Sequence, residues 1–336
     1  MKTRPNWAGA WTGWGGYPTH GIGGGAHEGR SRDCRTVGRG VALPVALTSI
    51  AAWSRGPLSP RGAVRRPHAG VTEPLPTAEG PLSVAVLIPS HRRVPVGLGR
   101  WRAEPGVSRV VVGWNGAGAP PAMPGATVRR LPWQGHGPTR SALLADVAEP
   151  YVLFTVDDAM PLAPGLVGTL VGALEEGGFD AVIPRQLPWA WTAATTAHRL
   201  AAWTPWASGP QVVAQVDHVC ALYRRQTLRD HPLPAVEIGE DLAWSAGRRI
   251  GLVPAVAVLH AHPRDPAALF ARERDLHAAR ARLGLPPTVA TTGALIGALP
   301  SLLGAGLRHG PGEALAQGAE LLGQWVGGRG GIAGRP

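Results

Sequence analysis

The segment from Tyr151 to Pro161 places two adjacent carboxylates directly after an apolar run. Five of the six residues 151–156 are β-branched or aromatic, and such a continuous run predicts a central strand buried on both faces. Asp157 and Asp158 then lie at the carboxyl end of that strand, where open α/β sheets bind their ligands. Carboxylate oxygens at this position suit Mg²⁺ or Mn²⁺ holding a diphosphate, although an aspartate pair capping a helix that begins near Pro161 explains the same residues.

From residue 82 onward, short apolar runs alternate with helical stretches, and this alternation predicts an α/β protein with helices on both faces of one sheet. We expect strands at 83–88, 109–112, 126–131, 151–156, 179–183, 216–223 and 252–259, and helices at 139–147, 166–176 and after Gly239. Leucines at 269, 276 and 283 recur every seven residues and predict the packing stripe of a later, Arg-rich helix.

Residues 1–80 differ in composition from the rest of the chain. They are rich in Gly, Pro, Ser and Arg and lack helical or strand periodicity, so we expect a disordered or mis-assigned N-terminal extension. This stretch holds ten of the 33 Lys and Arg residues against four of the 22 acids, and therefore more than half of the net charge of +11. A basic protein that binds nucleic acid would carry this surplus in its folded region, so we expect no nucleic-acid partner.

The N-terminal region also bears on location. Residues 41–53 resemble the hydrophobic part of a signal peptide but are shorter than the roughly 20 residues that span a bilayer. They also lie far from Met1, which favours a translation start further downstream. Cys34 and Cys220 offer no disulfide framework and no metal-ligand spacing, and a cytoplasmic location is the resulting expectation.

The C-terminal region is apolar but interrupted. Residues 291–307 carry no charge and contain four glycines and a proline, so we expect attachment to a membrane surface, if any, and no span. One face of a final helix is marked by Leu315, Ala319, Leu322 and Val326, and this face would rest on the core or on lipid.

Three further groups of residues suit chemistry. Glu240 and Asp241 lie in the first turn of a helix, where acids also commonly complement the helix N-terminus. His260 and His262 would face the same side of a strand and suit a metal ion, although such pairs are more often structural. Residues 135–140 precede a helix and offer backbone N–H groups and a guanidinium to a phosphate. The chain contains no Walker loop, dinucleotide-binding glycine motif or zinc-protease motif.

Seven short motifs occur in order over about residues 82–285. They are Val86-Leu-Ile-Pro-Ser90, His136-Gly-Pro-Thr-Arg140, Phe154-Thr-Val-Asp-Asp-Ala-Met-Pro161, Arg185-Gln-Leu-Pro188, Asp217-His-Val-Cys-Ala-Leu-Tyr-Arg-Arg225, Gly239-Glu-Asp-Leu-Ala-Trp244 and Ala257-Val-Leu-His-Ala-His262. In these motifs the chain resembles the family 2 glycosyltransferases with a GT-A-type fold, and most of all their rhamnosyltransferase-like branch. The resemblance implies a glycosyltransferase domain at 81–285 and a C-terminal helical tail at 286–336.

The resemblance also implies an inverting reaction and roles for individual residues. Asp158 would bind a divalent metal, Mg²⁺ or Mn²⁺, with His260 or His262 completing its shell. Asp241 matches the family's general base and has Glu240 beside it. The nucleotide sugar is expected to contact Pro89, Ser90, Arg140 and Asp157. A single in-line displacement with one base inverts the anomeric carbon, whereas a double displacement needs a carboxylate nucleophile.

The partners implied are a nucleotide diphosphate sugar as donor and a hydroxyl of a glycan, lipid-linked or small-molecule acceptor. Rhamnose is one candidate sugar, and hexosyl transfer in cell-envelope polysaccharide biosynthesis, with peripheral contact at the cytoplasmic face of the membrane, is the expected setting. The Trp-rich tract between Arg185 and Val216 suits a wall for the acceptor or, equally, a loop packed back on the core.

Two residues depart from the family pattern. Trp114 stands where the family usually has an acidic residue that reads the base, and Ser141 stands where Asn commonly follows the arginine. These changes predict an altered base contact in an active enzyme. A nucleotidyltransferase on a similar sheet is an alternative, for which residues 90–93 are only a faint match to the triphosphate loop. A catalytically silent family member that acts in an assembly is another.

Overall fold

The computed structural model describes residues 82–91, 93–189, 203–260, 265–285 and 291–330, together with positions 197, 200, 201 and 289. They belong to one compact unit, Glu73–Pro336. The expected N-terminal extension with its apolar stretch at 41–53, His262 and much of the Trp-rich tract lie outside the described residues.

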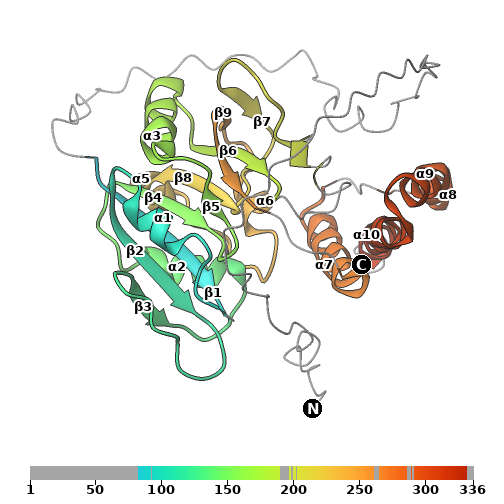
Figure 1. Cartoon of the computed structure of the whole chain (residues 1–336), viewed down its shortest axis with the longest axis horizontal. Helices are drawn as coiled ribbons and strands as arrows, with labels where there is room; N and C mark the ends of the chain where they lie inside the picture. The colour runs from blue at the N-terminus through green and yellow to red at the C-terminus, as the bar shows by residue number, and fades with distance from the viewer. Residues whose placement is uncertain are drawn as a thin grey trace, which may run out of the picture. The chain divides into compact units, whose positions relative to one another are not determined.

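Nine strands in the described part of the chain form one mixed sheet in the order β3–β2–β1–β4–β8–β6–β9–β5, with β7 also paired to β9 (Figure 1). The strands are β1 Val84–Ser90, β2 Val107–Trp114, β3 Thr127–Arg130, β4 Tyr151–Thr155, β5 Met160–Pro161, β6 Ala181–Leu187, β7 Gln211–Val213, β8 Cys220–Arg224 and β9 Ile250–Leu259. Strands β1 to β4 are parallel to one another, β8 is antiparallel to both β4 and β6, and β6 is parallel to β9. The predicted α/β class is confirmed.

Helices cover both faces of this sheet (Figure 1). The covering helices are α1 Leu98–Ala103, α2 His136–Leu144, α3 Leu166–Gly177, α5 Arg225–Asp230 and α6 Glu240–Trp244, and α7 Pro266–Arg282, α8 Thr292–Gly297, α9 Leu299–His309 and α10 Pro311–Gly330 follow them in the chain. Successive side chains of β1 point to opposite faces, so Val84, Val86 and Ile88 pack with α1 and α3, whereas Ala85 and Leu87 pack with α2, α5 and α6. Two apolar layers explain why the central strands have no polar face.

Several boundaries differ from the sequence expectations. Helix α2 begins at His136, three residues before the predicted start, because Gly135 adopts φ 104 and lets the chain turn directly into the helix. Strand β6 continues to Leu187 instead of stopping at Ile183, since a register shift at Pro184 accommodates the residue that cannot donate to the sheet. Strand β8 begins only at Cys220, because the Asp217 side chain accepts from the backbone N–H of Val219 and forms a turn there.

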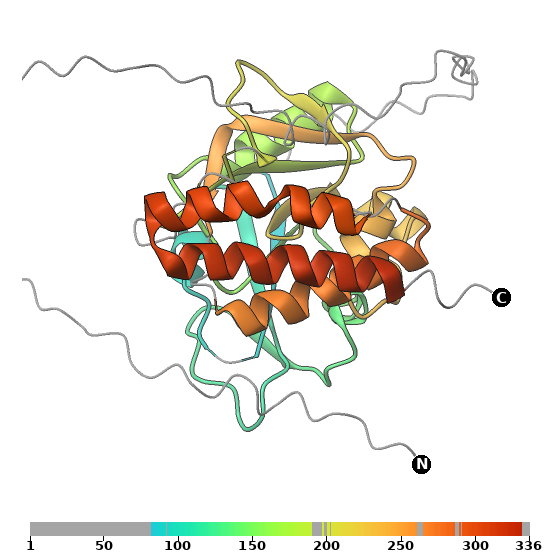
Figure 2. The same ribbon diagram turned by 90° about the vertical axis from the view of Figure 1, so that its right-hand side faces the viewer.

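The last helix packs through glycines. Helix α10 lies against α7 and α9 (Figure 2), and a Cβ atom at Gly323 or Gly327 would overlap the carbonyl oxygens of Phe270 and Arg274 on α7. Of the two alternatives for the predicted apolar face, core or lipid, packing on the core does not hold for two of its residues: Leu315 is 65% exposed and Leu322 42% exposed. The apolar pattern marked the outer face because glycines, which allow the closest approach of two backbones, carry no hydropathy signal. No helix in the described part of the chain combines the length and the apolarity needed to cross a bilayer.

Candidate active site

The site lies at one edge of the sheet, where the carboxyl ends of β1, β2, β4, β6 and β9 and the amino end of the antiparallel β8 meet. Thr155 at the end of β4 pairs with Cys220 at the start of β8, so the segments that follow β4 and precede β8 are neighbours. The buried polar side chains beside these strand ends include Ser90, Asp158, Gln186, His218 and His260. This edge is where α/β sheets commonly bind ligands.

The two aspartates after β4 differ in their contacts. The Ser90 hydroxyl, at the end of β1, donates a 2.8 Å hydrogen bond to Asp157 Oδ2. Asp158 is buried, and its Oδ1 lies 3.6 Å from His260 Nε2 at the end of β9. The Arg93 guanidinium stands 3.7 Å from Asp157 and 3.5 Å from Asp158, so a positive charge already accompanies both carboxylates.

This donor set fits a divalent cation. Asp158 offers hard carboxylate oxygens and His260 a ring nitrogen, a combination that suits Mn²⁺, and Arg93 shows that the two carboxylates accommodate a cation between them. The backbone N–H of His260 donates to Leu187 O at 2.9 Å, so the end of β6 holds the histidine in register with the site. His262 lies outside the described residues.

A second, deeper cluster surrounds Glu240 at the start of α6. Its Oε1 accepts from Arg140 Nη1 at 2.7 Å and from His218 Nδ1 at 2.9 Å, and His218 Nε2 lies 2.7 Å from the Tyr223 hydroxyl. An ionised carboxylate can only accept, so Nδ1 of His218 donates to Glu240. All four side chains are buried, which makes the cluster a hydrogen-bonded polar network inside the protein.

This network separates the pKa values of two neighbouring acids. Burial acts to raise the pKa of Glu240, but the hydrogen bond from His218 and the charge of Arg140 outweigh it and lower the pKa to about 2. Burial, followed by the negative charge of Glu240, raises the pKa of Asp241 to about 6. A carboxylate with that pKa can take up a proton near neutral pH, as a general base must. Its Oδ1 also accepts from the backbone N–H of Leu242 at 2.8 Å, which holds its orientation.

The same cluster is less suited to a metal ion. Ligand atoms of His218, Glu240 and Asp241 lie within 4.8 Å of one another, the closeness a bound cation requires. Both ring nitrogens of His218 are already hydrogen-bonded, however, and Glu240 is held by Arg140 at 2.7 Å, so a metal would have to displace a buried ion pair, whereas the Arg93 side chain next to Asp158 is 42% exposed. Between the two clusters, the Asp158 and His260 pair has the better donor set.

Residues 135–140, which were expected to offer backbone N–H groups to a phosphate, make contacts within the protein. The backbone N–H groups of His136 and Gly137 donate to Glu237 O and Val236 O, and a Cβ atom at Gly137 would overlap Pro234 O. These glycines and N–H groups therefore fasten the start of α2 to the loop before α6, and the expectation that they face a phosphate is wrong. Arg140 is buried against Glu240, and its contact with a nucleotide stays a prediction, as do the contacts of Pro89 and Ser90.

Sequence reasoning missed the roles of His218, Tyr223 and Arg93. His218 and Tyr223 lie inside a quoted motif, but nothing in the motif shows that the imidazole meets Glu240, 22 residues further along the chain. A further contact was missed as well: the Gln186 side chain on β6 donates to Asp217, directly before His218, at 2.7 Å.

Solved structures show which proteins share this architecture. The mannosyltransferase PcManGT from Pyrobaculum calidifontis, in complex with GDP-Man and Mn²⁺, matches with a TM-score of 0.50 at 16% identity, over 72% of this chain and 85% of that one. The chain has a GT-A-type glycosyltransferase fold. This confirms the fold expected from the seven motifs; their assignment to family 2 and to a rhamnosyl branch stays a prediction.

Other solved structures match the GT-A-type fold more distantly. GalNAc-T7 with UDP, GalNAc and Mn²⁺ has a TM-score of 0.42 at 12% identity over 55% of this chain, which spans 44% of the GalNAc-T7 chain. Residues 1–349 of Staphylococcus aureus TarS in complex with UDP-GlcNAc have a TM-score of 0.43 at 13% identity, over 67% of this chain and 79% of that one. No protein-family model matches the sequence, and no curated protein matches it either.

Proposed function

We propose that this protein is an inverting glycosyltransferase that moves a sugar from a nucleotide diphosphate sugar to an acceptor hydroxyl. The main support for the proposal is that two different groups lie at one edge of the sheet. Asp158 and His260 form a pair of ligands suited to a cation, and Asp241 is a separate carboxylate whose pKa is raised, as suits a base. A transferase needs both, because the leaving diphosphate gains negative charge while the acceptor loses a proton.

The proposed reaction uses these groups as follows. Asp241 takes the proton of the acceptor hydroxyl while that oxygen bonds to the anomeric carbon, and the bond from this carbon to the diphosphate oxygen breaks with its electrons leaving on the nucleoside diphosphate. A divalent metal held by Asp158 and His260 would offset the charge on that leaving group. Arg140 and His218 keep Glu240 ionised beside Asp241, which keeps the base poised near neutral pH.

PcManGT supports the class of donor, since a protein of the same fold is known in complex with GDP-Man and Mn²⁺. The seven ordered motifs support placement in the rhamnosyltransferase-like branch of family 2. On the acceptor side, Trp206 is 70% exposed, and the Arg185 guanidinium near the end of β6 lies 5.5 Å from the centre of its ring. An exposed indole face suits the C–H surface of a sugar, so we propose a glycan or lipid-linked acceptor.

The proposal is tested first by binding. The melting temperature of the protein is measured with nucleoside diphosphates and nucleotide sugars, each with and without Mn²⁺. At least one nucleoside diphosphate and its nucleotide sugar are expected to raise the melting temperature only when Mn²⁺ is present. Release of the nucleoside diphosphate from that donor is then measured with candidate acceptors. Asp241→Asn should keep the stabilisation and lose the release. No stabilisation by any donor, or full release by Asp241→Asn, would contradict the proposal, whereas release of pyrophosphate from a nucleoside triphosphate would favour a nucleotidyltransferase.

A further inference from the structure

The helices α8 and α9 expose an uncharged, leucine-rich surface. No charged residue occurs in the sequence between Arg282 and Arg308, and Ala305 is the one residue of these two helices that is buried in the described structure. A row of large apolar side chains is exposed at helical spacing: Ile296 by 59%, Leu299 by 50%, Leu303 by 70% and Leu307 by 89%. Surface helices of water-soluble proteins normally carry charged residues on their outer face. An exposed surface without charge indicates a site that contacts another apolar surface.

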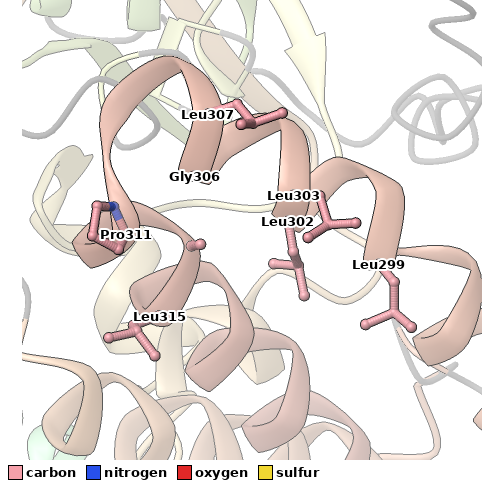
Figure 3. Close-up of a pocket in the computed structure, with 8 residues that line it drawn as sticks. Leu299, Leu302, Leu303, Gly306, Leu307, Pro311 and Leu315 are labelled. Carbon is pink, nitrogen blue, oxygen red and sulfur yellow. The ribbon is translucent and has the colours of Figure 1, made fainter.

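An apolar groove of about 530 Å³ continues this surface between α9 and α10 (Figure 3). Leu299, Leu302, Leu303 and Leu307 line it from α9, and Leu315 lines it from the first turns of α10. Leu315 is exposed because α10 uses its glycine face to pack on α7. The groove and the row of leucines therefore form one continuous surface, which we call the leucine face.

The exposed charges at the end of α9 are basic. Arg308 and His309 directly follow Leu307 and are exposed, whereas the nearest acid, Glu313 in the first turn of α10, is half-buried, and no acidic residue occurs between it and Asp275 in the sequence. Leucines with adjacent basic groups are the pattern of helices that lie in the interface of an anionic bilayer. A second copy of the chain is a poorer occupant, because two leucine faces packed together would bring their arginines toward one another.

We propose that the leucine face docks on an anionic membrane surface, with α8 and α9 lying in the plane of the headgroups. The leucines would enter the apolar region, and Arg308 would meet lipid phosphates. This inference does not rest on glycosyl transfer: the measurement below needs neither donor nor acceptor, so either idea can fail without the other.

The test is flotation of the full chain with vesicles of phosphatidylcholine alone or mixed with phosphatidylglycerol. The wild type is expected to float with the anionic vesicles, less with the neutral ones, and less in high salt. Because two exposed leucines are replaced by charged side chains that do not enter the apolar region, Leu303→Glu with Leu307→Glu should lower vesicle binding by at least about tenfold. Arg308→Glu should weaken binding to anionic vesicles and leave the residual binding to neutral ones unchanged.

Val212→Glu is the matched control, because Val212 is 64% exposed on β7 and does not belong to the leucine face. It should float as the wild type does, and all variants should melt at the wild-type temperature because the replaced side chains are exposed. The proposal is overturned if the wild type stays with the soluble fraction, or if the double variant floats equally well, which would assign lipid binding to another segment. A dimer in light scattering that the double variant dissociates, without flotation, would assign the leucine face to a second copy.

Discussion

Replacing Asp241 by Asn tests two effects of this carboxylate separately: the loss of protein stability that its charge causes, and its action as the base in the reaction. The pKa of Asp241 is raised from 3.8 to about 6, first by burial and then by the charge of Glu240. Between these two values the folded protein binds a proton that the unfolded chain has released, so stability falls as the pH rises through this window. Above pH 6 the folded protein carries a charge that its surroundings disfavour.

Asparagine has nearly the same shape and keeps an oxygen for the hydrogen bond from Leu242 N, but it cannot ionise. From the two pKa values, Asp241→Asn should raise the free energy of unfolding by up to about 3 kcal/mol at pH 8 and by about half as much at pH 5. Urea unfolding of wild type and variant at both pH values measures this difference. The control is Asp230→Asn at the exposed end of α5, for which we expect changes below about 0.5 kcal/mol at either pH.

The same substitution should abolish transfer, giving a protein that is more stable and inactive. In the wild type, kcat/KM should rise as the pH increases through about 6, because Asp241 must be ionised to accept the proton. The electrostatic reasoning would be refuted if the variant were no more stable than wild type at pH 8. It would also be refuted if the free energy of unfolding rose equally at both pH values. A variant with full activity would remove Asp241 from the role of base, whatever its stability.

Three further substitutions test other parts of the structure. Asp158→Asn should abolish the stabilisation by Mn²⁺ with a donor in thermal melts, and an unchanged metal response would place the cation elsewhere. Glu240→Gln leaves buried Arg140 without its counter-charge and should cost about 3–5 kcal/mol in urea unfolding, so a loss below about 1 kcal/mol would contradict the buried pair. Gly327→Ala inserts a methyl group against α7 and should cost about 1–3 kcal/mol, whereas Gly318→Ala, which meets no atom, should stabilise α10 slightly; equal effects would argue against the close packing.

Much of the sheet and half of the site could be predicted from local patterns. A run of β-branched and aromatic residues between Tyr151 and Val156 requires burial on both faces, and this places Asp157 and Asp158 at the end of a central strand in any fold that satisfies it. The alternation of strands and helices in turn requires helices on both faces. Such features depend on the spacing of neighbouring residues, which the chain carries in its own order.

Pairings between distant residues could not be predicted in the same way. Arg140 and Glu240 are separated by 100 positions, and the residues around each give no sign of the other. Arginine, histidine and two acids in a water-filled cleft would titrate near their ordinary values; buried together, they drive the pKa of Glu240 down and that of Asp241 up. The roles of the four groups are therefore set by contact and burial.

The last helix shows the same division. The spacing of its apolar residues predicted an amphipathic helix, and the amino-acid sequence alone determines this property. Which face turns inward was decided by Gly323 and Gly327, which let α10 approach the backbone of α7 more closely than any leucine face could. Sequence alone thus determined the central strands, several of the helices and the aspartates at the end of β4. Only the tertiary structure decided which acid is a base and which leucines meet the surroundings, because solvation and close packing depend on neighbours brought together by folding.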